Sequence, residues 1–133
     1  MLRSVCPKEG KQISVLVAED HPPLRELIAA VLDNAGYNVM TAECGDEALR
    51  IAREGGVDLL LTDVRMPGLS ASSLIDQFQA LSRNSGVVIM SGDITSSDGG
   101  PLKAQERVQF LQKPFTSKSL LATITQTLSD RPH

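Results

Sequence analysis

The sequence predicts an α/β domain built on a parallel sheet, and two observations favour this class. Short apolar runs of strand length recur five times along the chain, at 13–18, 37–42, 59–62, 87–90 and 108–111. Most of the intervening segments carry apolar residues with a period of about 3.6, which is typical of amphipathic helices. Strands that alternate with helices in this way are joined by right-handed βαβ crossovers, so the strands run parallel.

Length and composition are those of an ordinary globular domain. The chain has 133 residues, of which 41% are hydrophobic and 3% aromatic, so we expect one domain with an aliphatic core. The 13 basic and 16 acidic residues are spread along the chain and give a net charge of −3. Because no basic cluster is present in the sequence, direct nucleic acid binding is not expected. A membrane segment is not expected either, since no apolar run is long enough to span a bilayer.

The cysteines and the terminal segments indicate a domain with short tails in a reducing compartment. Cys6 and Cys44 lack the spacing of a metal site and are expected to be reduced thiols, which suits a cytoplasmic location. Residues 1–11 lack the apolar core of a signal peptide, so we interpret them as a flexible tail or linker. The predicted domain covers 12–129, and 130–133 are expected to form a second tail.

The first two strand–helix units are predicted from their apolar patterns. The continuous run at 13–18 is typical of a strand buried on both faces, and the prolines that follow suit the first turn of a helix. In that helix we expect one apolar stripe to face the core, formed by Leu24, Leu27, Ile28, Val31, Leu32 and Ala35. Strand 37–42 leads to a shorter helix that is expected to end at Gly55 and Gly56.

The last three units include one weak helix. A helix within 70–83 is expected to place four apolar residues on one face: Leu74, Ile75, Phe78 and Leu81. Residues 95–101 read Thr-Ser-Ser-Asp-Gly-Gly-Pro, which is turn chemistry, so the fourth helix should be short, displaced or mobile. Together the units predict a flavodoxin-like, doubly wound (βα)5 fold with a five-stranded parallel sheet, strand order 2-1-3-4-5 and a weakened fourth helix.

Polar side chains follow four of the predicted strands. They are Glu19 and Asp20 after the first, Asp63 after the third, Ser91 after the fourth and Lys113 soon after the fifth. The carboxyl ends of parallel strands meet at one edge of the sheet, so we expect these side chains to lie together. Gathered carboxylates repel one another unless a cation joins them, and oxygen ligands suit Mg²⁺. Taken alone, Glu19 and Asp20 could instead complement the dipole of the next helix, and Asp63 could simply begin a loop.

Four motifs resemble those of one family. They are Val17-Ala18-Glu19-Asp20, Leu61-Thr62-Asp63-Val64-Arg65-Met66-Pro67-Gly68, Met90-Ser91-Gly92 and Leu111-Gln112-Lys113-Pro114-Phe115. In this order and at this spacing they are similar to the receiver domains of two-component response regulators. The resemblance covers about Gln12 to Leu128. Each motif is weak separately, but the four together are highly specific.

The resemblance implies the chemistry of the polar residues. Asp63 would accept a phosphoryl group from a phosphohistidine, a covalent use of a carboxylate. Mg²⁺ would be held by Glu19, Asp20, Asp63 and the backbone carbonyl of Arg65. Lys113, with the metal, would neutralise the charge that develops on the transferring phosphoryl group.

The resemblance also implies a conformational switch. Ser91 would hydrogen-bond the phosphoryl group and draw its loop inward, and the ring of Phe110 would turn inward with it. The alternative for Phe110 is a plain core residue. The bond between Lys113 and Pro114 is predicted to be cis, against the usual preference of X-Pro bonds, so that the Lys113 side chain turns into the site.

Several residues depart from the family pattern or tune it. Glu19 stands where Asp is commoner, and its longer side chain would reach the metal through water. Arg65 and Asp93 fall at positions that, in the family, tune how water reaches the phosphorylated aspartate. His21 lies beside the acids, and we interpret it as an exposed loop residue rather than a ligand or phosphodonor.

The predicted function is that of a phosphoacceptor that switches conformation, not of an enzyme in its own right, although it would assist its own phosphorylation and dephosphorylation. Its partner would be a histidine kinase or a phosphotransfer domain, and a homodimer is a further candidate. One alternative is a pseudo-receiver, a non-phosphorylated protein interaction module, against which the complete acid, Ser91 and Lys113 set argues. Another is a phosphate-ester hydrolase, which would need an acid where Arg65 stands. The segment 110–121 resembles receivers of hybrid sensor kinases, and a single-domain regulator is the other parent considered.

Overall fold

The computed structural model of the protein describes residues 12–64, 70–81, 85–91 and 108–129. Within these ranges, five parallel strands form one sheet in the order β2-β1-β3-β4-β5. The strands are β1 (Ser14–Ala18), β2 (Asn38–Ala42), β3 (Leu59–Asp63), β4 (Gly86–Ser91) and β5 (Val108–Gln112). The predicted flavodoxin-like sheet and its strand order are confirmed.

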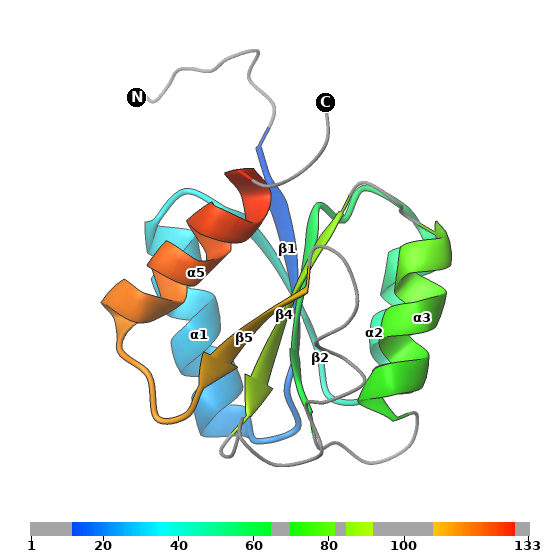
Figure 1. Ribbon diagram of the computed structural model, residues 1–133, viewed down its shortest axis with the longest axis horizontal. Coiled ribbons are helices and arrows are strands. Elements are labelled where there is room, and N and C mark those ends of the chain that lie inside the picture. The colour runs from blue at the N-terminus through cyan, green and yellow to red at the C-terminus, as the bar shows by residue number, and fades with distance from the viewer. Residues whose placement is uncertain (1–11, 65–69, 82–84, 92–107, 130–133) are drawn as a thin grey trace.

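Helices cover both faces of this sheet. They are α1 (Pro22–Asn34), α2 (Gly45–Arg53), α3 (Ala71–Leu81) and α5 (Ser117–Ser129). Figure 1 shows α1 and α5 on one face and α2 and α3 on the other, which is the doubly wound arrangement. The prediction of a weakened fourth helix concerns residues that lie outside the described ranges, as do the two predicted tails.

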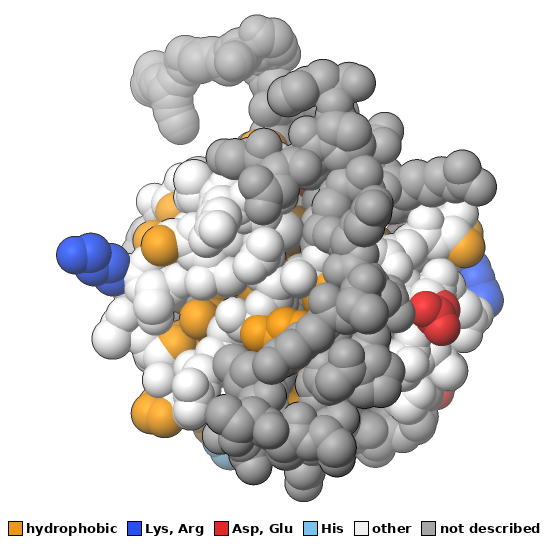
Figure 2. Space-filling view, in the orientation of Figure 1, with side chains coloured by type: hydrophobic (Ala, Val, Ile, Leu, Met, Phe, Trp, Pro, Cys, Tyr) orange, Lys and Arg blue, Asp and Glu red, His pale blue; other side chains and the backbone are white. Residues whose placement is uncertain are grey.

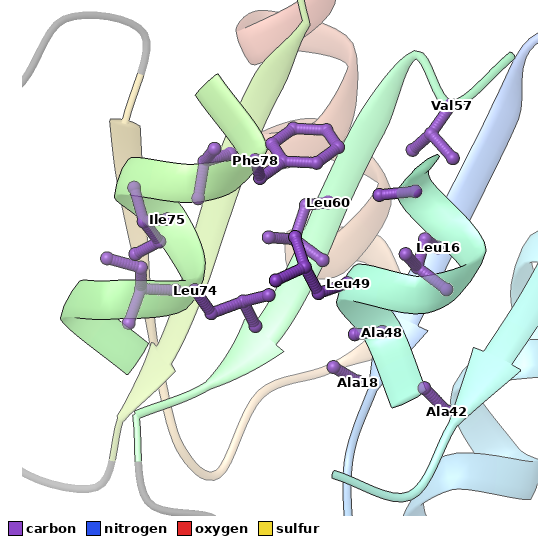
Figure 3. Close-up of a cluster of buried hydrophobic side chains, with 13 residues drawn as sticks. Leu16, Ala18, Ala42, Ala48, Leu49, Val57, Leu60, Leu74, Ile75 and Phe78 are labelled. Atoms are coloured by element: carbon purple, nitrogen blue, oxygen red, sulfur yellow. The ribbon is translucent and has the colours of Figure 1, made fainter. Parts of the chain in front are cut away.

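Alternation of side chains along the strands produces two separate cores. Leu16 and Leu60 belong to a buried cluster between the sheet and helices α2 and α3 (Figure 3). The next residue of each strand, Val17 or Leu61, belongs to the cluster under α1 and α5. All of β3 is buried, as expected for a central strand that is covered on both sides.

The apolar stripe predicted for α1 is wrong at two positions. Leu27 is 58% exposed and Ala35 is also exposed, whereas Ile28 is fully buried. Consecutive helix residues lie about 100° apart around the axis, so Leu27 falls on the flank of α1 when Ile28 faces the sheet. Ala35 lies past the last residue of α1, as its C-cap. In α3, Leu81 is 49% exposed at the helix end, beyond the fully buried Phe78.

The edge strand β5 is less covered than the central strands. Its residues 108–110 are half-buried, and Leu111 is its buried residue. Figure 2 shows hydrophobic side chains at the molecular surface over β5 and α5, among atoms of the backbone and of other uncharged side chains. The sheet therefore has a fully buried centre and a half-covered edge.

Hydrogen bonds extend beyond the strands and position the carboxyl edge of the sheet. The backbone N–H of Glu19 donates to the carbonyl of Ala42 over 3.1 Å, which ties the end of β1 to β2. On the other side, the N–H of Lys113 donates to the carbonyl of Ser91 over 2.7 Å. These bonds hold the residues that follow β1 and β5 at defined places along one edge.

Candidate functional site

Three carboxylates gather at the carboxyl edge of the sheet. Glu19 and Asp20 follow β1, and Asp63 is the last residue of β3. Each offers one carboxylate oxygen, and these three oxygens all lie within 4.8 Å of one another. Glu19 is 1% exposed and Asp63 is 8% exposed, whereas Asp20 is exposed to solvent. The structure thus brings together the acids that the sequence assigned to one site.

Lys113 lies between the two buried acids. Its Nζ is 3.0 Å from Oδ2 of Asp63 and 3.4 Å from Oε1 of Glu19. The peptide bond between Lys113 and Pro114 is cis, as the sequence predicted. An ammonium that contacts both carboxylates can also neutralise a further anion bound between them.

Glu19 is held in an environment that disfavours its charge. Burial raises the pKa of Glu19 above its ordinary value, and the negative charge of Asp63 raises it further. The backbone N–H of His21, 3.1 Å from Oε2, and the ammonium of Lys113 oppose this rise. A carboxylate in such a position gains most from an additional cation.

The environment of Lys113 favours its charged form. Burial lowers the pKa of its ammonium, but the hydrogen bond to Asp63, the charge of that residue and the weaker contact with Glu19 outweigh burial. The pKa of Lys113 therefore lies above its ordinary value. Its side chain is consequently charged at neutral pH.

The switch residues predicted from the sequence lie on strands β4 and β5. Ser91 ends β4 and is buried, with 5% of its surface exposed. Phe110 lies in β5, opposite Ile89 in the sheet register, and its half-buried side chain packs against the core under α2 and α3. The rate-tuning roles predicted for Arg65 and Asp93 concern residues outside the described ranges.

Two residues beside the acids differ in how well the sequence predicted them. His21 is exposed, in agreement with the prediction, and serves as the N-cap of α1. No role was predicted for Arg25 from the sequence, although its Nη1 donates a 2.9 Å hydrogen bond to the backbone carbonyl of Glu19. An arginine one turn into the helix after the acids is a weak signal, because most such side chains are solvated.

Comparison with known proteins decides the family. A family model described as the response regulator receiver domain matches residues 15–125 of this chain. The chain belongs to the response regulator receiver domain family. As a receiver domain it is a phosphoacceptor, in agreement with the function predicted from its motifs.

Relatives of this receiver domain include both transcriptional regulators and sensor kinases. Transcriptional regulatory protein GlrR of Escherichia coli strain K12 is 30% identical over 118 residues, which are 89% of this chain and 27% of that protein. Sensor kinase CckA of Brucella abortus strain 2308 is 32% identical over 117 residues, 86% of this chain and 12% of that kinase. The chain therefore spans only a small part of these relatives.

Solved structures agree with this assignment. The crystal structure of the receiver domain from hybrid histidine kinase CckA is 34% identical, with a TM-score of 0.73 over 86% of this chain and 98% of that one. The receiver domain of sensor histidine kinase PA1611 from Pseudomonas aeruginosa PAO1 is 25% identical, with a TM-score of 0.80 over 90% and 99% of the two chains. That second structure has a magnesium ion coordinated in its active site cleft.

Among residues 12–64, 70–81, 85–91 and 108–129, no helix is both long and apolar enough to cross a membrane.

Proposed function

We propose that this receiver domain takes a phosphoryl group from a phosphohistidine onto the carboxylate of Asp63. One observation carries the proposal: Asp63 lies 3.0 Å from the ammonium of Lys113, within a cluster that also contains Glu19 and Asp20. The carboxylate that would accept the phosphoryl group and the ammonium that would balance its negative charge are thus already in contact. Catalysis of phosphoryl transfer depends mainly on such positioning and charge neutralisation.

The transfer is a displacement at phosphorus. A carboxylate oxygen of Asp63 forms the new bond to phosphorus, while the bond from phosphorus to the imidazole nitrogen breaks and its electron pair leaves with the imidazole. Lys113 pairs with the phosphoryl oxygens as the transfer proceeds. The hydroxyl of Ser91, at the end of the neighbouring strand, would hydrogen-bond the transferred group.

The acidic cluster fits Mg²⁺. Its oxygen donors suit a hard cation. Burial and the charge of Asp63 raise the pKa of Glu19, so a bound cation would stabilise its carboxylate. Glu19, Asp20 and Asp63 would hold the ion, with the backbone carbonyl of Arg65 as a further ligand. When bound, Mg²⁺ neutralises charge on the transferring phosphoryl oxygens. The magnesium ion in the PA1611 receiver supports this assignment.

Phosphorylation would act by shifting the population of two conformations. The shift would involve the loop after Ser91 and the ring of Phe110, which is half-buried and packs against the core under α2 and α3. Arg65 and Asp93 would tune how long the phosphoryl group persists. The domain would assist its own phosphorylation and dephosphorylation without being a separate enzyme.

The phosphohistidine donor indicates the class of partner. A phosphohistidine donor requires a histidine kinase or a phosphotransfer domain, and we propose a cytoplasmic location. The similarity to the CckA receiver supports a hybrid histidine kinase as the parent protein. A homodimer is a further proposed assembly.

Labelling with acetyl phosphate tests the proposal. The protein should take up phosphate in the presence of Mg²⁺ and lose the label when a chelator is added before the reaction. Asp63→Asn should abolish labelling, because its amide is not a nucleophile. Asp33→Asn, which makes the same change at an exposed position of α1, should label like the wild type. Full labelling of Asp63→Asn would contradict the site, and no labelling of the wild type would favour the pseudo-receiver.

A further inference from the structure

A guanidinium outside the phosphoryl cluster contacts the backbone that carries the acids. Arg25 is the fourth residue of α1, and its side chain is 15% exposed. Its Nη1 lies 2.9 Å from the carbonyl oxygen of Glu19, and its Nη2 lies 3.9 Å from a carboxylate oxygen of Glu43. We propose that Arg25 is a positioning residue for metal binding, which holds the peptide group between Glu19 and Asp20 in place. This inference rests on the proposed function.

The position of the contact explains how it would act. The carbonyl oxygen of Glu19 belongs to the planar peptide group that joins Glu19 to Asp20, so a bond to that oxygen restrains the plane from which Asp20 starts. The N–H of Glu19 is already bonded to the carbonyl of Ala42, and the N–H of His21 to the carboxylate of Glu19. The bond from Arg25 therefore adds a third restraint on the chain around the two acids.

The Nη2 atom of Arg25 contacts the loop that follows β2. Glu43 lies in that loop, and its backbone N–H donates a 2.8 Å hydrogen bond to the carboxylate of Glu47 in α2. Arg25 thus links α1, the loop with the acids and the loop before α2. The side chain of Glu43 is 75% exposed, so its ion pair is a weak contribution. The bond to the Glu19 carbonyl, which is charge-assisted and less exposed, is the contact that matters here.

This role differs from a direct electrostatic one. The groups that lower the pKa of Glu19 against burial are the N–H of His21 and the ammonium of Lys113. Arg25 instead contacts the main-chain oxygen of Glu19 and is not among the groups that shift this pKa. We therefore expect loss of Arg25 to weaken metal binding by loosening Glu19 and Asp20.

Matched arginine variants test this inference. Arg25→Met keeps an apolar stem but removes the donor, and Arg53→Met removes the same charge from an exposed position in the last turn of α2. Calorimetric titration with MgCl₂ should give a dissociation constant about tenfold higher for Arg25→Met than for the wild type. This is the low end of the effect of removing groups that orient metal ligands. Arg53→Met should stay within about twofold of the wild type, since exposed charges are screened.

Hydrogen exchange in the absence of metal provides an independent measurement. Arg25→Met should speed amide exchange at Glu19 to His21, while the amides of Val15 to Val17, inside β1, should exchange as in the wild type. A purely global loss of stability would speed both regions together. Arg25→Lys keeps the charge and one donor but not the fork of Arg, so its metal affinity should fall between those of the wild type and Arg25→Met.

The outcomes separate this inference from the proposed function. If the wild type binds Mg²⁺ and both Arg25 variants bind it equally well, with unchanged exchange at Glu19 to His21, the inference is overturned and the proposed function stands. If the wild type neither binds Mg²⁺ nor takes up label, the proposed function fails. The exchange measurement on the metal-free protein then still decides whether Arg25 restrains the loop.

Discussion

At the scale of single residues, the site depends on one ammonium that serves two acids. Lys113 contacts the carboxylates of both Asp63 and Glu19, of which Glu19 is almost fully buried. Without Lys113, those two charges would face each other with less compensation, and an incoming phosphoryl group would add more negative charge. The same residue thus balances charge in the resting site and, in the proposed function, would also do so during the transfer.

Replacing Lys113 should therefore slow phosphorylation without removing the phosphoacceptor. We expect Lys113→Met to lower the rate of labelling by acetyl phosphate about a hundredfold, the usual cost of removing one group that stabilises transition-state charge. The measurement is the initial rate of label uptake at saturating Mg²⁺. Lys118→Met, an exposed lysine of α5, is the control and should label at the wild-type rate. Equal rates for the two variants would contradict the role of Lys113.

At the scale of elements, each helix that covers the sheet contributes only a narrow stripe of apolar side chains to the core. Only part of the apolar surface of α1 reaches the core, because Ile28 is fully buried while Leu27 is 58% exposed. Close contacts also limit what the strands tolerate. A Cβ added to Gly86, at the start of β4, would lie 2.5 Å from Cγ2 of Thr127 in α5.

The difference between neighbouring residues of α1 can be measured directly. Ile28→Ala should lower the free energy of unfolding by about 2–5 kcal/mol, because it removes a fully buried side chain. Leu27→Ala should change it by no more than about 0.5 kcal/mol, as for most surface substitutions. Urea denaturation of both variants gives these values. Equal losses would mean that Leu27 is packed in solution.

The contact between β4 and α5 supports a second prediction at this scale. Gly86→Ala should cost about 1–3 kcal/mol, because Thr127 is fully buried and its hydroxyl is held by a 2.7 Å hydrogen bond to the carbonyl of Thr123. The double variant Gly86→Ala with Thr127→Ser should regain most of that stability, since serine keeps the hydroxyl and removes the methyl group. Urea denaturation of the two single variants and the double variant completes the cycle.

At the scale of the whole molecule, the proposed metal binding by acids from separate segments would be linked to the stability of the fold. Glu19 follows β1, Asp63 ends β3 and Lys113 follows β5. Unfolding separates the three chain segments, so the unfolded chain has no assembled site. An ion that joins the acids therefore favours the folded molecule as a whole.

Mg²⁺ should accordingly raise the melting temperature of the wild-type protein. A ligand at about 100 times its Kd adds about 2.7 kcal/mol of stability, and a chelator should reverse the effect. Asp20→Asn should reduce the shift, because it removes the charge of an exposed, proposed ligand. Asp33→Asn should retain the full shift. The measurement is thermal unfolding followed by circular dichroism, and a shift that survives Asp20→Asn unchanged would contradict the role of Asp20.

The sequence by itself determined the sheet, the helix positions and the polar residues at the strand ends. Periodicity reports which residues are buried along a regular element, and the edge rule for parallel sheets brings Glu19, Asp63 and Lys113 together without any knowledge of distances. The tertiary structure decided which flank of α1 is exposed, as Leu27 shows, and how the acids are held. The contact of Arg25 with the Glu19 carbonyl depends on a side-chain direction and a backbone oxygen, neither of which leaves a pattern in the order of residues. Local patterns follow from chain periodicity, whereas contacts between side chains and irregular backbone arise only when the whole fold sets their distance.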